Sequence, residues 1–182
     1  GLSAYAYHNT RILAPLIFLI LILLLKKSLF RAKKIFLLLL IIAAVFFLPL
    51  IKIMTSTEGS ARSIWVGILN QGAINQINEY INSAELPASV AKFIYNKPIY
   101  FITKATENYL GYFSPIFLGV KGGTQYQFSV PNFGIIPMLS IPFFYLGLFL
   151  LLINFRKNNL EKKFLLIWLL LGPIPAALTR DP

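Results

Sequence analysis

Four long apolar segments constrain the fold of this chain more than any other feature, because none of them carries a charged residue at its centre. A helix needs about 20 mostly apolar residues to cross about 30 Å of hydrocarbon. The segments approach this length, and the last is the shortest. We therefore expect about four transmembrane helices, at residues 12–30, 35–51, 133–153 and 164–178.

The composition favours a membrane protein over a water-soluble one. Hydrophobic residues make up 57% of the chain and charged residues 13%, whereas soluble domains average about 45–50% apolar and about a quarter charged residues. So much apolar surface requires lipid around it. The predicted fold class is therefore an all-α integral membrane protein.

The positive residues indicate which side of the membrane each loop faces. The short segments 26–34 and 156–163 hold nine of the seventeen Lys and Arg residues. They fall on one side if four helices alternate, and the positive-inside rule places that side in the cytoplasm. Residues 1–11, 52–132 and 179–182 then share the outer, non-cytoplasmic face.

The net charge of +11 would suggest nucleic acid as the partner of a soluble protein. Here the cations cluster between the spans, so membrane lipid is the expected partner and nucleic acid is not. The sequence has no cysteine, which rules out disulfides and thiolate metal sites within it. With one histidine and scattered carboxylates, we expect no metal site and no bound cofactor.

The outer loop, residues 52–132, is too long to be a bare connector. Apolar positions between residues 64 and 69 follow a helical spacing, which predicts a modest amphipathic helix from about residue 60. A second helix is expected over residues 73–81. Residues 89–113 combine aromatic and apolar side chains with lysines, as is typical of interfacial amphipathic helices in the headgroup region.

Two features are expected to divide the rest of this loop. Pro98 is expected to bend or split the second helical stretch. The glycines at 122–123 and the segment 130–134 indicate turns before the third span.

We treat residues 1–182 as one partial membrane domain. The sequence opens with Gly1 rather than Met, and it ends at Pro182, directly after a hydrophobic span. We therefore expect an internal piece of a longer protein.

The candidate site residues are polar side chains that lie where the spans meet the outer face. Tyr7, His8 and Arg11 precede the first span. The planar guanidinium group of Arg11 suits a phosphate, and His8 can titrate near neutrality or donate to a phosphate oxygen. An interfacial belt of tyrosine rings with a snorkelling arginine is the simpler interpretation on composition alone.

Three further groups lie on the same face. Arg180 and Asp181 follow the fourth span and form either an exposed ion pair of small energetic value or part of a phosphate cavity. Glu58 and Arg62 are four residues apart, which fits either a capped helix start with an ion pair or a pocket-lining carboxylate. The aromatic residues before Gly122 either stack on sugars or anchor a loop at the interface.

Taken together, these motifs resemble bacterial membrane glycosyltransferases of the GT-C fold, in particular the protein O-mannosyltransferase and aminoarabinose-transferase-like group. Residues 1–15 match the pattern small-Leu-Ser-x-Tyr-x-Tyr-His-x-x-Arg-x-x-x-Pro found there. The other similar segments are 57–62, 112–122, 129–134 and 172–181. The resemblance rests on the order and spacing of the whole set, which covers nearly the whole chain.

The resemblance implies transfer of a sugar from a polyprenyl-phosphate donor to an acceptor, on the outward face of the cytoplasmic (inner) membrane of a bacterium. In that group an acidic general base in the first outer loop deprotonates the acceptor hydroxyl. This chain does not contain that loop, so we assign it no catalytic base. The resemblance makes His8, Arg11 and Arg180 candidates for holding the lipid phosphate, and Tyr7 and Glu58 candidates for lining the pocket.

Two other functions stay open from the residues alone. A transporter or flippase segment would place polar residues in the middle of its spans, and these spans have few. A non-catalytic membrane scaffold would show no convergence of His8, Arg11 and Arg180 around one cavity. The sequence does not decide that point.

Overall fold

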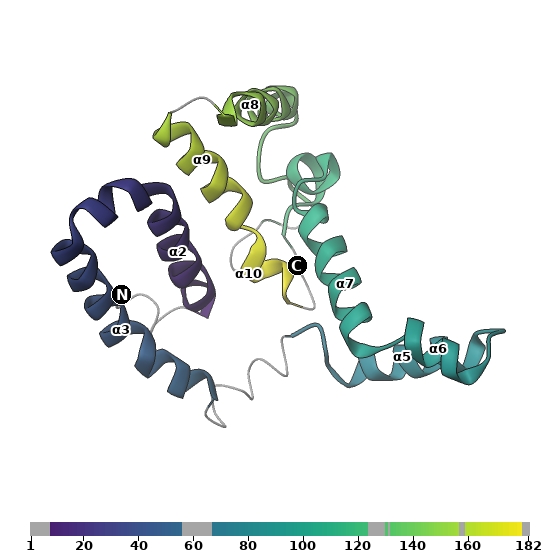
Figure 1. The fold of residues 1–182 in the computed structure, drawn as a ribbon. Helices are drawn as coiled ribbons and strands as arrows, with labels where there is room; N and C mark the ends of the chain where they lie inside the picture. The colour runs from purple at the N-terminus through teal and green to yellow at the C-terminus, as the bar shows by residue number, and fades with distance from the viewer. Residues whose placement is uncertain (1–7, 56–66, 124–129, 131, 157–158, 180–182) are drawn as a thin grey trace. The chain divides into compact units, whose positions relative to one another are not determined.

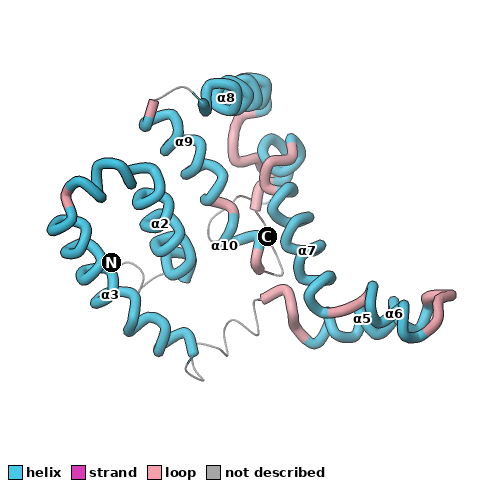
Figure 2. Tube along the Cα trace, viewed as in Figure 1, coloured by secondary structure: helices cyan, strands magenta, loops and turns pink. Residues whose placement is uncertain are grey.

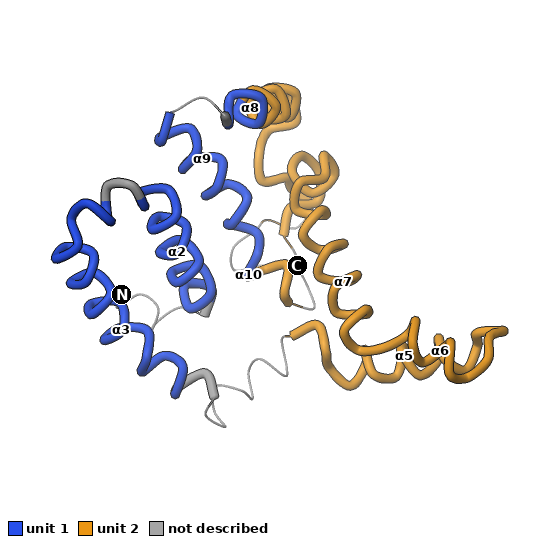
Figure 3. The backbone as a smooth tube through the Cα atoms, viewed as in Figure 1, with its two compact units in different colours: residues 1–61, 151–175 blue, residues 62–150, 176–182 orange. Residues whose placement is uncertain are grey.

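A computed structural model describes residues 8–55, 67–123, 130, 132–156 and 159–179. Within these ranges the chain is helical throughout, with short turns between helices and one isolated β-bridge, so the all-α prediction is confirmed (Figures 1 and 2). The chain forms two compact units (Figure 3). Unit 1 comprises residues 1–61 and 151–175, and unit 2 comprises residues 62–150 and 176–182.

Unit 1 is built around two long apolar helices, α2 (His8–Arg31) and α3 (Lys33–Thr55). Both are long and apolar enough to cross a membrane. The two helices contact each other, and the rings of Phe18 and Phe47 lie 6.1 Å apart between their centroids. The first two predicted spans thus lie within helices of sufficient length.

The helix through the two lysines agrees with the predicted span 12–30, but the loop expected between residues 30 and 35 is shorter than predicted. α2 continues through both lysines to Arg31, and α3 begins at Lys33, which leaves only Ala32 between them. Lys, Arg and Leu are good helix formers, so charge alone does not end a helix. The amide of Phe36 donates to the carbonyl of Ala32 at 3.0 Å, so the second helix starts immediately.

The third and fourth predicted spans are shorter than expected. Residues 133–137 are not helical, and the chain bends at residues 135–136. The apolar helical stretch is Met138–Ile153, made of η2 (Met138–Ser140) and α8 (Ile141–Ile153). Proline lacks an amide hydrogen, which explains why a helix starts after Pro137 rather than before it. By length and composition the described chain has two candidate spans, so the expectation of four is not met by this measure.

The fourth predicted span breaks where the sequence suggested. α9 (Leu160–Leu171) is followed by a turn at Gly172 and Pro173, and then by the four-residue α10 (Ile174–Ala177). The side chain of Asn159 accepts a hydrogen bond from the amide of Lys162 at 3.2 Å and so caps the start of α9.

Unit 2 contains three helices from the segment between the second and third predicted spans: α5 (Gln71–Ser83), α6 (Ala88–Ile94) and α7 (Lys97–Gly111). The side chain of Asn70 caps α5, and that of Asn96 caps α7, each accepting a backbone hydrogen bond. Pro98 lies in the first turn of α7, where its missing amide hydrogen costs nothing. The chain is therefore divided near Pro98, as expected.

The prediction of a helix from about residue 60 is wrong for residues 67–70, the part of it that the structure describes. Gly67 pairs with Thr179 in an antiparallel bridge, and residues 68–70 bend. A helix starts only at Gln71, because Asn70 adopts an extended backbone and caps it. Ile68, an apolar residue that suggested a helix face, is buried outside any helix and is only 3% exposed. Residues 60–66 lie outside the described ranges.

Two segments of unit 2 pack closely against each other at Gly119 and Gly134. After α7 comes a π-helical turn, η1 (Phe117–Lys121), which ends at Gly122 with a positive φ of 63°. The amide of Ile136 donates to the carbonyl of Leu118 at 3.0 Å. A side chain at Gly134 would place its Cβ 2.5 Å from both Cα and O of Gly119. The two glycines therefore allow two backbone segments to touch.

Candidate functional site

The structure describes little of the candidate site predicted from sequence. Tyr7, Glu58 and Arg180 lie outside the described residues. His8 is the first residue of α2, and Arg11 lies three residues further along the same helix. Arg11 is partly exposed and makes at least one interaction. Whether these residues converge on one cavity therefore remains a prediction.

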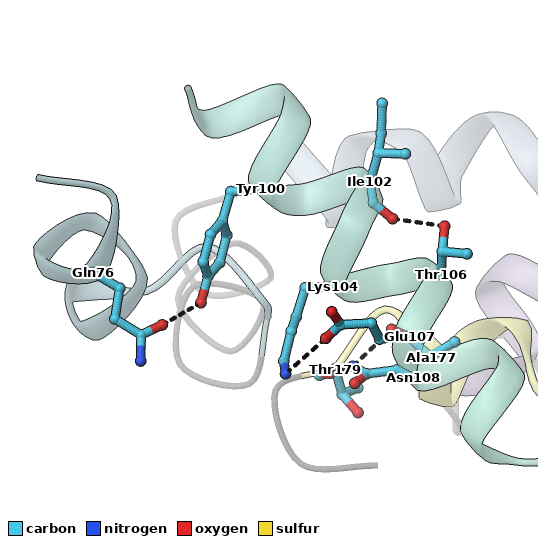
Figure 4. Close-up of polar contacts among 9 residues, drawn as sticks. All are labelled: Gln76, Tyr100, Ile102, Lys104, Thr106, Glu107, Asn108, Ala177 and Thr179. Atoms are coloured by element: carbon cyan, nitrogen blue, oxygen red, sulfur yellow. Dashed lines mark hydrogen bonds and ion pairs between the residues drawn. The ribbon is translucent and has the colours of Figure 1, made fainter. Parts of the chain in front are cut away.

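The most fully built polar arrangement in the described chain centres on Asn108, which the sequence analysis did not single out. Asn108 lies on α7, and its side chain is buried, with 7% of the residue exposed. Its amide nitrogen donates to the carbonyl of Ala177 at 3.2 Å and to the carbonyl of Thr179 at 2.9 Å (Figure 4). One side chain therefore satisfies two backbone carbonyls about seventy positions further along the chain.

The backbone at Thr179 is held by further hydrogen bonds. Its amide and its hydroxyl group both donate to the carbonyl of Ala176, at 3.0 Å and 2.6 Å. It also pairs with Gly67 in the isolated bridge. The segment that leads to the candidate Arg180 is thus fixed at its last described residue within unit 2.

Aromatic rings follow Asn108 along the chain. Tyr109 packs edge-on against Phe113 with 5.4 Å between ring centroids, and Tyr112 packs edge-on against Phe117 at 4.8 Å. The hydroxyl group of Tyr145 on α8 donates to the carbonyl of Phe113. These contacts hold the segment that the sequence analysis considered for sugar stacking.

Burial raises the pKa of Tyr109 above its usual value and raises the pKa of Tyr112 to about 12. The cause is desolvation, which disfavours the charged phenolate. Both tyrosines therefore stay neutral at physiological pH. They can donate hydrogen bonds, but they cannot serve as anionic bases there.

We expect the raised pKa of Tyr112 to make the folded chain less stable at alkaline pH. In the unfolded chain the phenol ionises near pH 10, while in the folded chain it stays neutral to about pH 12. The stability contributed by the neutral phenol is complete below pH 10 and is lost as the pH rises toward 12. The midpoint temperature of thermal unfolding, measured across this pH window, should fall less steeply with pH in Tyr112→Phe than in the unmodified chain. An equally steep fall in that variant would contradict the assignment.

No group of three or more His, Asp or Glu side chains that could hold a metal was found among the described residues. An ion pair in unit 2 joins Lys104 to Glu107 at 3.2 Å, and both side chains are exposed. An exposed pair of this kind contributes little to stability. The described part of the site therefore offers hydrogen-bond donors and aromatic surface rather than metal ligands.

Comparisons with known proteins gave no match: no protein-family model, no curated protein and no solved structure is similar to this chain.

Proposed function

We propose that this chain is part of a membrane glycosyltransferase that moves a sugar from a polyprenyl-phosphate donor to an acceptor on the outer face of a bacterial inner membrane. The donor tail lies in the bilayer beside the apolar helices. We expect polar residues at the outer ends of the spans to bind its headgroup. Four spans, with residues 52–132 outside, complete the proposed topology.

One observation carries the proposal. Segments that resemble the glycosyltransferase group are far apart in sequence, yet the described parts of two of them, 112–122 and 129–134, and residues 176–179 of a third belong to unit 2. The segment 112–122 touches 132–134 at the paired glycines. α7, which leads into 112–122, is bonded through Asn108 to residues 177–179. A set of motifs that serves one site is expected to gather in this way.

The large exposed apolar side chains of α3 support the membrane setting. Ile41, Val45 and Leu48 are each more than half exposed. Exposed apolar patches of this extent mark surfaces that contact lipid or other protein segments. A donor with a polyprenyl tail requires a site beside such a surface.

The proposed roles follow from the charge that develops during transfer. The leaving lipid phosphate gains negative charge, which cations hold best. We assign that role to His8, Arg11 and Arg180, with Tyr7 and Glu58 lining the pocket. The acceptor hydroxyl loses its proton to a carboxylate base, a role that we assign to no residue of this chain. Transfer then breaks the bond from the sugar to the phosphate and forms the bond to the acceptor oxygen.

Replacement of Arg11 tests this proposal. In the full-length protein reconstituted in vesicles, we expect Arg11→Ala to lower sugar transfer from a polyprenyl-phosphate sugar about 30-fold. This corresponds to the loss of about 2 kcal/mol from a charge-assisted phosphate contact. Arg11→Lys should recover part of the activity, because it keeps the charge but loses the planar fork. Radiolabel passed to acceptor in a membrane extract is the measurement.

Arg31→Ala is the matched control, because Arg31 lies exposed at the opposite end of the same helix. We expect it to leave transfer unchanged. If the unmodified protein transfers no sugar from any polyprenyl-phosphate donor but moves the lipid across the bilayer, the flippase alternative holds. If it does neither, the chain belongs to a scaffold.

A further inference from the structure

Positive charge gathers without an acidic counterpart at the corner between α2 and α3 (Figure 1). Four cations are exposed there, Lys26, Arg31, Lys33 and Lys34, and residues 8–55 contain no Asp or Glu. Within the ranges that the structure describes, no ion pair joins any of the four to a carboxylate. The corner therefore presents a positive surface that suits an anionic partner.

A pair of aromatic rings fixes the geometry of this corner. The rings of Phe30 and Phe36 lie 5.6 Å apart between their centroids, with only a short piece of chain between them. Lys26 precedes Phe30 by four residues, and Lys33 precedes Phe36 by three, so each lysine shares a helix face with a ring. The ring contact thus brings together the two helix faces that carry Lys26 and Lys33.

The other two cations lie on different faces of the same helices. Arg31 follows Phe30 by one residue, which turns it about 100° around α2. Lys34 precedes Phe36 by two residues, which turns it about 200° around α3. These two residues add positive charge to the corner but do not share a face with the rings.

Lys26 and Lys33 also mark the ends of the two candidate spans. The apolar window of α2 ends at Lys26, and that of α3 starts at Lys33. In a bilayer these positions lie where the hydrocarbon meets the headgroups, which is the depth of the lipid phosphates. Phe30 and Leu23, on the same face as Lys26, are both more than half exposed. Apolar surface for acyl chains therefore adjoins the cations.

We propose that Lys26 and Lys33, with the paired rings of Phe30 and Phe36, form a binding site for an acidic phospholipid. The two lysines hold the phosphate oxygens, and the rings pack against the glycerol and the first acyl carbons. A zwitterionic headgroup also brings an ammonium group, for which residues 8–55 offer no carboxylate. The site lies at the opposite end of α2 from His8, so it does not depend on sugar transfer.

Native mass spectrometry of the full-length protein tests the site, by counting the phosphatidylglycerol molecules retained as this lipid is titrated into detergent micelles. We expect the double variant Lys26→Ala, Lys33→Ala to weaken the affinity about 30-fold, which is about fivefold for each cation beside a lipid phosphate. The double variant Lys26→Arg, Lys33→Arg keeps both charges and should stay within about threefold of the unmodified protein. Unchanged affinity in the alanine variant would overturn the proposal.

The double variant Arg31→Ala, Lys34→Ala is the charge-matched control, because it removes two charges from the other helix faces. At physiological salt, where screening acts over about 8 Å, we expect it to weaken the affinity at most about threefold. An equal loss in both alanine variants would show that net charge alone attracts the lipid, and the site would not exist as described.

A second measurement separates a lipid site from a site for phosphate alone. Glycerol 3-phosphate carries the charged group without acyl chains, and we expect even a hundredfold excess not to displace phosphatidylglycerol. Phe30→Ala should weaken phosphatidylglycerol binding about fivefold, and phosphatidylcholine should bind at least about tenfold more weakly than phosphatidylglycerol. Displacement by glycerol 3-phosphate, unchanged affinity in Phe30→Ala, or equal binding of the two lipids would each contradict the proposal.

The result is independent of the proposed function. A protein that transfers sugar but retains no phosphatidylglycerol would keep the glycosyltransferase proposal and lose this site. A protein that retains phosphatidylglycerol in the expected order of variants but transfers no sugar would do the reverse.

Discussion

Gly134→Ala is expected to destabilise the folded chain by about 3 kcal/mol, near the upper end of overpacking effects in well-packed sites. The new Cβ would lie 2.5 Å from both Cα and O of Gly119. These are backbone atoms, so no side-chain rotation relieves the overlap and the two segments must separate. For a chain of this size the midpoint of thermal unfolding should fall by about 6–12 °C. Thermal unfolding in detergent, followed by circular dichroism, is the measurement.

Gly147→Ala is the matched control for this prediction. Gly147 lies within α8, and a Cβ there meets no atom within 4 Å. Alanine is favoured over glycine in a helix, so this variant should be unchanged or more stable by about 0.5–1 kcal/mol. A Gly134→Ala variant as stable as Gly147→Ala would show that the segments 117–121 and 134–136 are not in contact.

Ile41→Arg is expected to reduce membrane insertion of α3 strongly. Ile41 lies near the middle of the apolar stretch Lys33–Lys52 and is 53% exposed. Arginine at the centre of a spanning helix costs about 2.5–3.5 kcal/mol of insertion free energy. The fraction of chains that resist alkaline extraction from membranes should fall accordingly.

Ile41→Leu is the control, because leucine keeps the size and apolar character of the side chain. We expect its insertion to match that of the unmodified chain. Equal insertion of Ile41→Arg would mean that this face of α3 meets water or a polar partner, and α3 would then not be a lipid-facing span.

The elements that sequence analysis predicted well are those with strong local signals. The uninterrupted apolar runs gave α2 and α3, and Pro98 and Gly172 marked real breaks. The helix prediction was wrong near Ile68, which fits a helical spacing of apolar residues. Ile68 is buried next to the bridge at Gly67 instead of lying on the apolar face of a helix. The bridge partner, Thr179, is too far along the chain for any local pattern to reveal it.

The site was harder to predict than the fold. Tyr7, His8, Arg11, Glu58 and Arg180 were chosen by residue type and by resemblance, and only Arg11 has its side chain described. Asn108 was missed because an asparagine in a helix normally faces solvent or ends a turn. Its one local signal was an amide side chain among aromatic residues. The role of Asn108 depends on its hydrogen bonds to the carbonyls of Ala177 and Thr179, which lie near it only in the folded chain.

The long reach of the Asn108 contacts has a consequence for synthesis of the chain. Asn108 and Thr179 are 71 positions apart in the chain, and Gly67, which pairs with Thr179 in the bridge, is separated from it by more residues still. A ribosome must therefore make α8 and α9 before unit 2 can close, and until then the Asn108 amide has only water to bind. A nascent chain that stalls or is cut before Ala176 lacks both carbonyl partners of Asn108, so unit 2 cannot be completed.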